Sequence, residues 1–170
     1  MWRKMLDFAA PLIVVTPLLI LACSSAKDSS KFATGAAQGG MAEVELGRLA
    51  TQRAGDPSVR EFGARMVADH SRANAELKSI ATQKGIQLPA DVDSEQKSEM
   101  DKLSKMSGAD FDKEYMSAMV KDHQTDVKDF DTQSKDGNDA EIKAFAVRTL
   151  PTLQQHLSMA EQTAQKVGAK

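Results

Sequence analysis

Apolar residues recur at intervals of three and four along four long stretches of this chain, which is the spacing of amphipathic helices. The first stretch covers about 32–53, the second covers about 57–84, the third follows Gly108, and the last follows Asn138. No stretch alternates apolar and polar residues as a half-buried strand does. The pattern predicts an all-α protein whose long helices, joined by short connections and one longer one, form a four-helix bundle.

Local residues also predict where some helices begin and end. Asp56 precedes a proline at the first helical position and is a favourable N-cap, while Gly85 is a favourable C-cap for the same helix. In the connector between the second and third long helices, Asp93 and Gln96 have the spacing of a capping box. We therefore expect a short extra helix there, ending near Met106.

The last long helix carries two local signals. Asn138 and Glu141 have the spacing of a capping pair and predict its start. Pro151 lies inside the apolar pattern, where a proline removes one backbone hydrogen bond and clashes with the preceding turn. We expect this helix to bend near Val147, whose carbonyl loses its partner.

Two segments in the second and third long helices are nearly copies of each other. "EFGARMVADH" ends at His70 and "EYMSAMVKDH" ends at His123. The chain has three histidines, and the third, His156, lies on the apolar stripe of the last helix. Glu43 lies on the stripe of the first helix. Each long helix therefore directs one ionisable side chain towards the common core, and we expect His70 and His123 to face each other there.

A buried carboxylate and buried imidazoles need partners, because an unpaired charge in the core costs several kcal/mol. Glu43, His70, His123 and His156 could satisfy one another by binding one transition-metal ion, and zinc, iron, manganese and copper all accept such ligands. A hydrogen-bonded polar core without metal is the alternative. Met66 and Met119 lie one turn before two of the histidines and would suit copper, although methionines on such a stripe usually serve packing.

Asp69 and Asp122 each precede a histidine of the repeat directly. Neighbouring positions on a helix lie about 100° apart, so these carboxylates cannot point at the same ion as His70 and His123. We expect them to be either hydrogen-bond partners that orient the metal ligands, or surface charges.

The overall composition is that of one ordinary globular domain. The chain has 170 residues, of which 41% are hydrophobic and 27% are charged, and its formal net charge is −2. Nucleic-acid binding needs a basic surface, so nucleic acid is not an expected partner. A catalytic serine triad, a nucleophilic cysteine, a P-loop and a dinucleotide-binding motif are all absent from the sequence. We expect a binding or structural protein rather than an enzyme, and no catalytic residue.

The N-terminal residues have the layout of an export signal, with two basic residues ahead of a short apolar stretch. The stretch ends at "ILAC", which resembles a bacterial lipobox except for its bulky Leu21. We expect residues 1–22 to be a signal peptide, Cys23 to be lipidated, residues 23–31 to be a lipidated N-terminus and tether, and residues 32–168 to be the helical domain. An ordinary cleaved signal with an unmodified cysteine is the alternative.

Such a lipoprotein would be attached to a membrane through its N-terminal lipid. The serine after Cys23 favours the outer membrane by the sorting pattern it resembles, so we expect the protein on the periplasmic side of the bacterial cell envelope. Cys23 is the only cysteine, and an intramolecular disulfide is therefore impossible.

Four segments resemble a bacterial family known as domain of unknown function 4142: "GGMAEVELGRLA", "VREFGARMVADHSRANAELKSIATQKGIQLP", "DFDKEYMSAMVKDHQTDVKDF" and "IKAFAVRTLPTLQQHL". The resemblance covers nearly all of residues 32–163. It implies a ferritin-like four-helix bundle that is exported in many members, and it implies no activity. The recurrent motif positions of the family correspond here to Glu43, Asp69, His70, Asp122, His123 and His156.

The histidines depart from the pattern of di-iron bundles, which place a glutamate three residues before a metal-binding histidine. Val67, Val120 and Leu153 stand at those positions here. Ferroxidase or oxygenase chemistry is therefore disfavoured. Two hypotheses stay open: a bundle that binds one metal ion, and an envelope structural or interaction module whose histidines form a satisfied polar core.

Overall fold

The computed structural model describes residues 18–169, with side chains described from residue 28 onwards. This part of the chain contains five α-helices and no strand, which confirms the prediction of an all-α fold. The predicted short helix in the connector is present as α3. None of the described helices combines the length and apolar character needed to cross a membrane. The helices are α1 (Leu18–Arg53), α2 (Pro57–Lys84), α3 (Ser94–Ser104), α4 (Gly108–Asp136) and α5 (Ala140–Val167).

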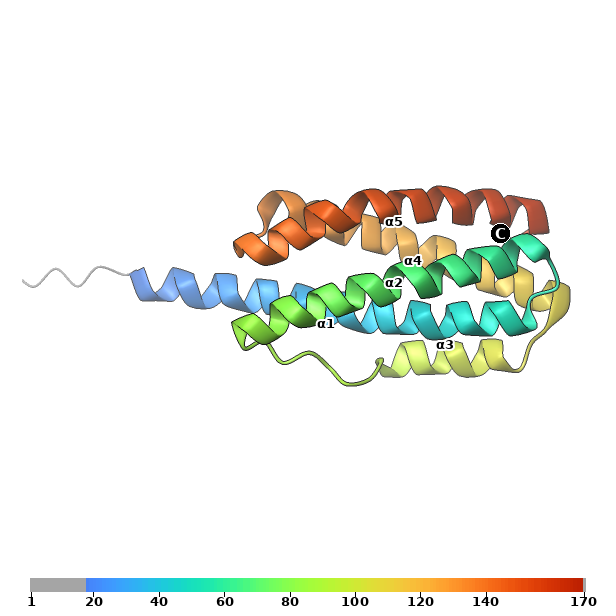
Figure 1. The fold of residues 1–170 in the computed structure, drawn as a ribbon, viewed down its shortest axis with the longest axis horizontal. Coiled ribbons are helices and arrows are strands. Elements are labelled where there is room, and N and C mark those ends of the chain that lie inside the picture. The colour runs from blue at the N-terminus through green and yellow to red at the C-terminus, as the bar shows by residue number, and fades with distance from the viewer. Residues whose placement is uncertain (1–17, 170) are drawn as a thin grey trace, which may run out of the picture.

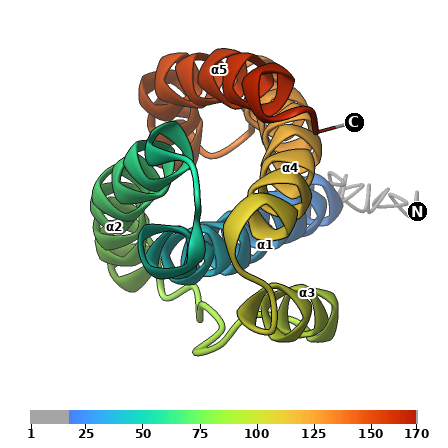
Figure 2. The same cartoon turned by 90° about the vertical axis from the view of Figure 1, so that its right-hand side faces the viewer.

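The four long helices surround a common core, as the end-on view in Figure 2 shows. α1 packs chiefly against α2, and α4 packs chiefly against α5. The connector that contains α3 leads the chain from one end of the molecule back to the other, so α2 and α4 run in the same direction (Figure 1). α3 itself lies outside the ring of long helices, against α1 and α4.

The first helix begins at Leu18, so the predicted start at Phe32 is wrong. Residues 24–31, expected as a tether ahead of the helix, are part of α1. No glycine or proline interrupts the chain between Leu18 and Phe32, and the last few residues before Phe32 pack against the rest of the fold. Ser29 is buried, and the ring of Phe32 lies 4.9 Å from that of Phe130. The expected signal peptide lies mostly outside the described residues.

The capping residues predicted for α2 and α3 are confirmed, and the one predicted for α5 needs a correction. The Asp56 side chain caps α2, Gly85 ends it in the left-handed conformation at φ 66°, and Asp93 forms a capping box with N3 of α3. The cap of α5 is Asp139, whose side chain accepts hydrogen bonds from two backbone N–H groups of the first turn. The predicted cap at Asn138 is therefore wrong by one residue. α5 continues through Pro151 without interruption.

The core contains two apolar clusters. The first cluster lies towards the α1–α2 turn and the second towards the α4–α5 turn. Gly47 and Gly63 let α1 and α2 approach closely, because a Cβ at Gly47 would lie 2.6 Å from the Gly63 carbonyl oxygen. Members of the first cluster include Leu46, Phe62, Met66, Phe111, Tyr115, Met119 and Ala160; the second includes Ala37, Leu77, Phe130, Ile142, Phe145 and Leu153.

Candidate metal centre

A layer of ionisable side chains separates the two apolar clusters, and we call Glu43, His70, His123 and His156 the histidine layer. Each long helix supplies one of them, as the sequence pattern predicts. All four are buried: Glu43 and His70 are 2% and 6% exposed, and the other two histidines are fully covered. The amphipathic stripes therefore place all four groups not only inside the fold but also at one level along it.

The two copies of the internal sequence repeat lie on α2 and α4, and their equivalent side chains face each other across the core. The rings of His70 and His123 lie 5.8 Å apart, centroid to centroid. One layer further along, the rings of Phe62 and Tyr115 lie 6.1 Å apart. The prediction that the two histidines face each other is confirmed, and the two aromatic residues occupy equivalent positions of the repeat. His156 completes the group, at 5.3 Å from His70 and 5.4 Å from His123.

One nitrogen of each imidazole lies beside an oxygen atom. His70 Nδ1 is 2.8 Å from Glu43 Oε2, and His156 Nε2 is 2.9 Å from Asp69 Oδ2. His123 Nδ1 is 2.9 Å from the backbone carbonyl oxygen of Met119. A neutral imidazole carries its proton on the nitrogen that faces an acceptor. The opposite nitrogen of each ring then bears a lone pair.

Those opposite nitrogens have no hydrogen-bond partner among the described residues. They are His70 Nε2, His123 Nε2 and His156 Nδ1, of which His123 Nε2 lies 3.3 Å from Glu43 Oε1 without a well-directed hydrogen bond. One nitrogen from each ring lies within 4.8 Å of one from each of the others. Buried polar atoms are normally satisfied, so three orphaned imidazole nitrogens in one layer need an explanation. A zinc–nitrogen bond is about 2.0–2.1 Å long, so a bound ion would draw the three rings closer together.

The environment of the layer keeps the imidazoles neutral. Burial lowers the pKa of His70 and of His156 to about 4, against the hydrogen bond between His156 and Asp69, which acts to raise it. Burial also lowers the pKa of His123, although the charge of Glu43 opposes this. Metal ligation requires unprotonated imidazole nitrogen, and at neutral pH all three rings are in that state.

Glu43 is the least satisfied member of the layer. Its two oxygens lie 2.8 Å from His70 Nδ1 and 3.3 Å from His123 Nε2, yet neither has a well-directed hydrogen-bond partner among the described residues. Burial raises the pKa of Glu43 to about 7, and the charge of His123 only partly opposes this. The carboxyl group is therefore placed where it can orient His70, contact an ion, or exchange a proton near neutral pH.

The Asp69 carboxylate contacts His156 from α2, with Oδ2 2.9 Å from His156 Nε2. Arg65 and Arg72 both contact its carboxylate from the same helix. Burial acts to raise the pKa of Asp69, but its hydrogen bonds with His156, Arg72 and Arg65 outweigh burial and lower it. An ionised Asp69 fixes the proton of His156 on Nε2 and points the lone pair of Nδ1 away from Asp69.

The structure does not give Asp122 the corresponding place beside His123, whose Nδ1 faces the Met119 carbonyl instead. Asp122 is half-buried; burial raises its pKa to about 7, with the charge of Glu99 on α3 as the next cause. Sequence reasoning missed Asp126, which lines a small cavity together with Glu43 and His70. Its signal was its position three residues after His123, which is one helical turn along the same face.

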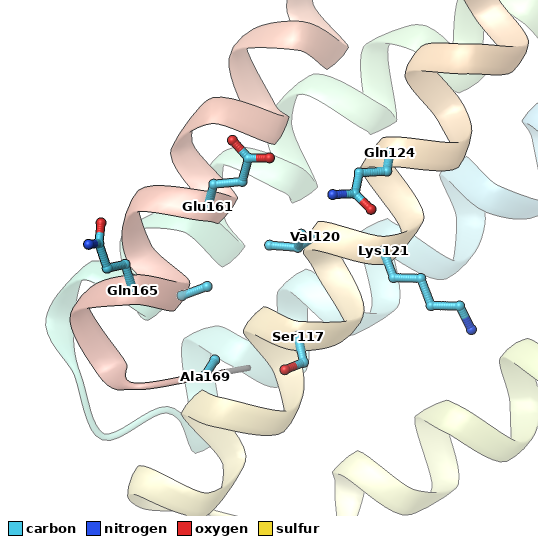
Figure 3. A pocket seen from close by; sticks show the side chains of 8 residues that line it. Ser117, Val120, Lys121, Gln124, Glu161, Gln165 and Ala169 are labelled. Carbon is cyan, nitrogen blue, oxygen red and sulfur yellow. The ribbon is translucent and has the colours of Figure 1, made fainter.

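A separate groove of about 440 Å³ lies on the surface between α4 and α5 (Figure 3). Gln124 and Glu161 project from the two helices on either side of it, and Ala169 lies near its end. The groove contains no member of the histidine layer. It is lined by Ser117, Val120, Lys121, Gln124, Glu161, Ala164, Gln165 and Ala169.

Solved structures with the same fold have very different sequences. A DUF305 fragment from Deinococcus radiodurans matches with a TM-score of 0.72 and 13% identity, over 82% of this chain and 96% of that chain. A putative secreted DUF305 protein from Streptomyces coelicolor matches with a TM-score of 0.70 and 16% identity, over 84% of this chain and 95% of that chain. A conserved hypothetical protein from Mycobacterium tuberculosis matches with a TM-score of 0.64 and 12% identity, over 83% of this chain and 93% of that chain. These likenesses establish the fold alone.

The comparison with curated proteins gave no match. A family model, however, matches residues 22–163, a range that includes every member of the histidine layer and all five helices apart from a few terminal residues. The resemblance seen in the repeated histidine segments is thereby confirmed, and the chain belongs to the family described as a domain of unknown function, DUF4142.

Proposed function

We propose that this protein binds one transition-metal ion in its histidine layer, through His70, His123 and His156, with Glu43 beside them. The proposal rests on one observation: one nitrogen of each histidine faces an oxygen acceptor, while the opposite nitrogens are buried and make no hydrogen bond among the described residues, although His123 Nε2 lies 3.3 Å from Glu43 Oε1. This is the usual arrangement around a metal-binding histidine, whose second nitrogen donates to a carboxylate or a backbone carbonyl.

The donor set favours some ions over others. Three neutral imidazoles suit zinc, copper, iron and nickel, whereas magnesium and calcium prefer oxygen ligands. Manganese, which the sequence also leaves open, would depend more strongly on the Glu43 carboxylate. Met66 and Met119 belong to the apolar cluster next to the layer, which is consistent with a packing role and gives copper no special support.

Thermal melts of the metal-free protein, with and without each metal, test the proposal. An ion bound only by the folded state, at a free concentration of one hundred times its dissociation constant, should add about 2.7 kcal/mol of stability. The gain should disappear with chelator and should be mostly lost in each of His70→Ala, His123→Ala and His156→Ala. An unchanged wild-type melting temperature with zinc, iron, manganese and copper would contradict the proposal and favour a metal-free polar core.

Asp69→Asn separates a ligand from a residue that positions one. Asparagine keeps the shape of Asp69 but weakens its hold on the His156 proton, and partners of this kind typically change metal affinity 10–100-fold. Isothermal titration should therefore show weaker binding by Asp69→Asn, but not the loss expected for His156→Ala. Asp129→Asn, an exposed aspartate on α4, is the matched control and should bind like the wild type.

We also propose that the protein is exported and attached to a membrane by a lipid on Cys23, on the periplasmic side and at the outer membrane. The export-type N-terminal sequence supports this, and one structural neighbour bears the description of a putative secreted protein. A single acyl chain gives marginal binding, and stable attachment needs the several chains of a lipoprotein. Fractionation of cells that express Cys23→Ser should release the protein from the membrane; retention equal to wild type would contradict the anchor.

We further assign the arrangement of the long helices to the ferritin-like four-helix bundles. The connectivity supports this, because one long crossover joins two parallel helices, α2 and α4. The ligand set differs from that of di-iron proteins, since valine or leucine stands three residues before each histidine. A mononuclear centre fits these residues, and metal analysis of saturated protein should give one ion per chain.

A further inference from the structure

A small cavity of about 20 Å³ borders the histidine layer on the side of the second apolar cluster. Its polar lining comes from Glu43, His70, Asn74, Asp126 and Thr149, and its remaining wall includes Phe130 and Phe145. A cavity needs about 10–15 Å³ of this kind of space to hold one water molecule, so this one is large enough for a water.

The polar side chains around the cavity are suited to holding a water molecule. Glu43 is 2% exposed and its two oxygens lack well-directed partners among the described residues. Asp126 brings a second carboxyl group to the same cavity, and Asn74 brings an amide that both donates and accepts. A buried water usually makes about three hydrogen bonds, which is the number these groups offer.

Gly40 on α1 keeps the cavity open. A Cβ at this position would lie 2.1 Å from Asn74 Oδ1, so any larger residue would push the Asn74 side chain away from α1. The glycine is buried and belongs to the same cavity lining. Gly35 lies on the same helix but is exposed, and a Cβ there would meet no atom within 4 Å.

We propose that this cavity binds one water molecule through Glu43, Asn74 and Asp126, and that this water is the exchangeable ligand of the metal ion in the histidine layer. The inference rests on the proposed metal site and deepens it. Structural metal sites are closed by protein ligands, whereas catalytic sites combine three protein ligands with a water. His70 belongs both to the histidine layer and to the cavity lining, so a water held in the cavity would make this centre an open one.

Pulsed electron paramagnetic resonance of the Cu²⁺-loaded protein in D₂O tests the inference. The nitrogen couplings report the bound imidazoles, and the deuterium couplings report a directly bound water. We expect both signals in the wild type and in Gly35→Ala. Gly40→Ala should keep the imidazole signals and lose the bound-water signal. Asn74→Leu, which replaces the amide by an apolar group of similar size, should give the same loss if Gly40→Ala fails to fold.

The outcomes separate the two proposals. Imidazole signals without a bound-water signal in the wild type would overturn the water site and leave the metal site intact. An equal bound-water signal in the wild type, Gly40→Ala and Asn74→Leu would place the water elsewhere and would also overturn it. Absence of imidazole signals would overturn the metal site itself. A crystal structure of the metal-free protein should then still show an ordered water between Glu43, Asn74 and Asp126, and its absence would contradict the cavity assignment directly.

Discussion

Asp112 and Glu43 are both buried carboxylates, 4% and 2% exposed, but their surroundings are opposite. Asp112, near the start of α4, accepts hydrogen bonds from the backbone N–H groups of Gly55 at 2.9 Å and Asp56 at 2.8 Å. It thereby ties the α1–α2 turn to α4. Glu43, in the histidine layer, has two histidines within reach and no well-directed hydrogen bond among the described residues.

The difference separates a carboxylate that stabilises the fold from one for which we propose a functional role. A buried carboxylate that stabilises the fold has its oxygens satisfied, because an unpaired charge in the core is costly. Glu43 and the three histidine nitrogens beside it are left partly unsatisfied, together and in one layer. We infer that the fold tolerates their cost because a ligand satisfies them.

The largest effect that would sharpen this comparison is expected from Asp112→Ala. The substitution leaves two backbone N–H groups without their charged acceptor, and each such bond is worth about 1.5–3 kcal/mol. Because the groups are only part-buried, we expect a loss of about 3 kcal/mol in the free energy of unfolding by urea at pH 7. The exposed Asp129→Ala should change it by less than about 0.5 kcal/mol. A small effect of Asp112→Ala would show that water replaces the carboxylate and that the turn is held by other contacts.

Glu43→Gln should act in the opposite direction in the metal-free protein. Burial raises the pKa of Glu43 to about 7 from 4.5, so the folded state favours the protonated form. Its contribution to stability is complete below pH 4.5 and is lost as the pH rises through 7. Glutamine resembles the protonated form at every pH. We therefore expect Glu43→Gln to be more stable than the wild type by up to about 3 kcal/mol at pH 8, and equally stable near pH 4.

Urea unfolding at both pH values, with chelator present, measures this difference. Asp112→Asn provides the matched control, because removal of the same charge there should cost stability at pH 8. If Glu43→Gln were also destabilising at pH 8, an ionised Glu43 would be well paired in the metal-free fold, and the contrast between the two carboxylates would disappear.

Local residues were enough to predict most of the helix ends and the convergence of the histidine layer. A capping side chain or a C-terminal glycine acts within one turn, so Asp56, Gly85 and Asp93 could be recognised from their neighbours alone. The layer followed from helical periodicity, because four stripes that face one core bring their central residues together. Asp139 was missed because the adjacent Asn138 is an equally competent cap.

Features that depend on long-range packing were not predictable. The helical residues directly before Phe32 pack into the fold, since Ser29 is buried, and the polar sequence around Ser29 does not indicate this. The hydrogen-bond partners of Asp112, Gly55 and Asp56, lie in the turn between α1 and α2, more than fifty residues earlier in the chain. Asp126 reaches the cavity beside Glu43 only because of how α1 and α4 are set against each other.

The smallest expected effect concerns Tyr115, the one other residue near the layer with an orphaned buried oxygen. Its ring is fully covered and stacks on Phe111, with centroids 5.4 Å apart, but its hydroxyl has no hydrogen-bond partner among the described residues. Burial raises the pKa of Tyr115 well above 10, so the hydroxyl stays neutral. Removing an unsatisfied hydroxyl recovers its desolvation cost and leaves only a small cavity.

Tyr115→Phe should therefore raise the free energy of unfolding slightly, by up to about 1 kcal/mol, and should leave the metal-dependent gain in melting temperature unchanged. The reverse substitution in the adjacent ring, Phe111→Tyr, adds an unsatisfied hydroxyl to the same apolar cluster and should destabilise by about 1–2 kcal/mol. A loss of stability in Tyr115→Phe would mean that the hydroxyl is hydrogen-bonded in solution. If the metal-dependent gain fell as well, Tyr115 would belong to the metal centre, and the boundary between the apolar cluster and the histidine layer would lie about two helical turns closer to the α1–α2 turn.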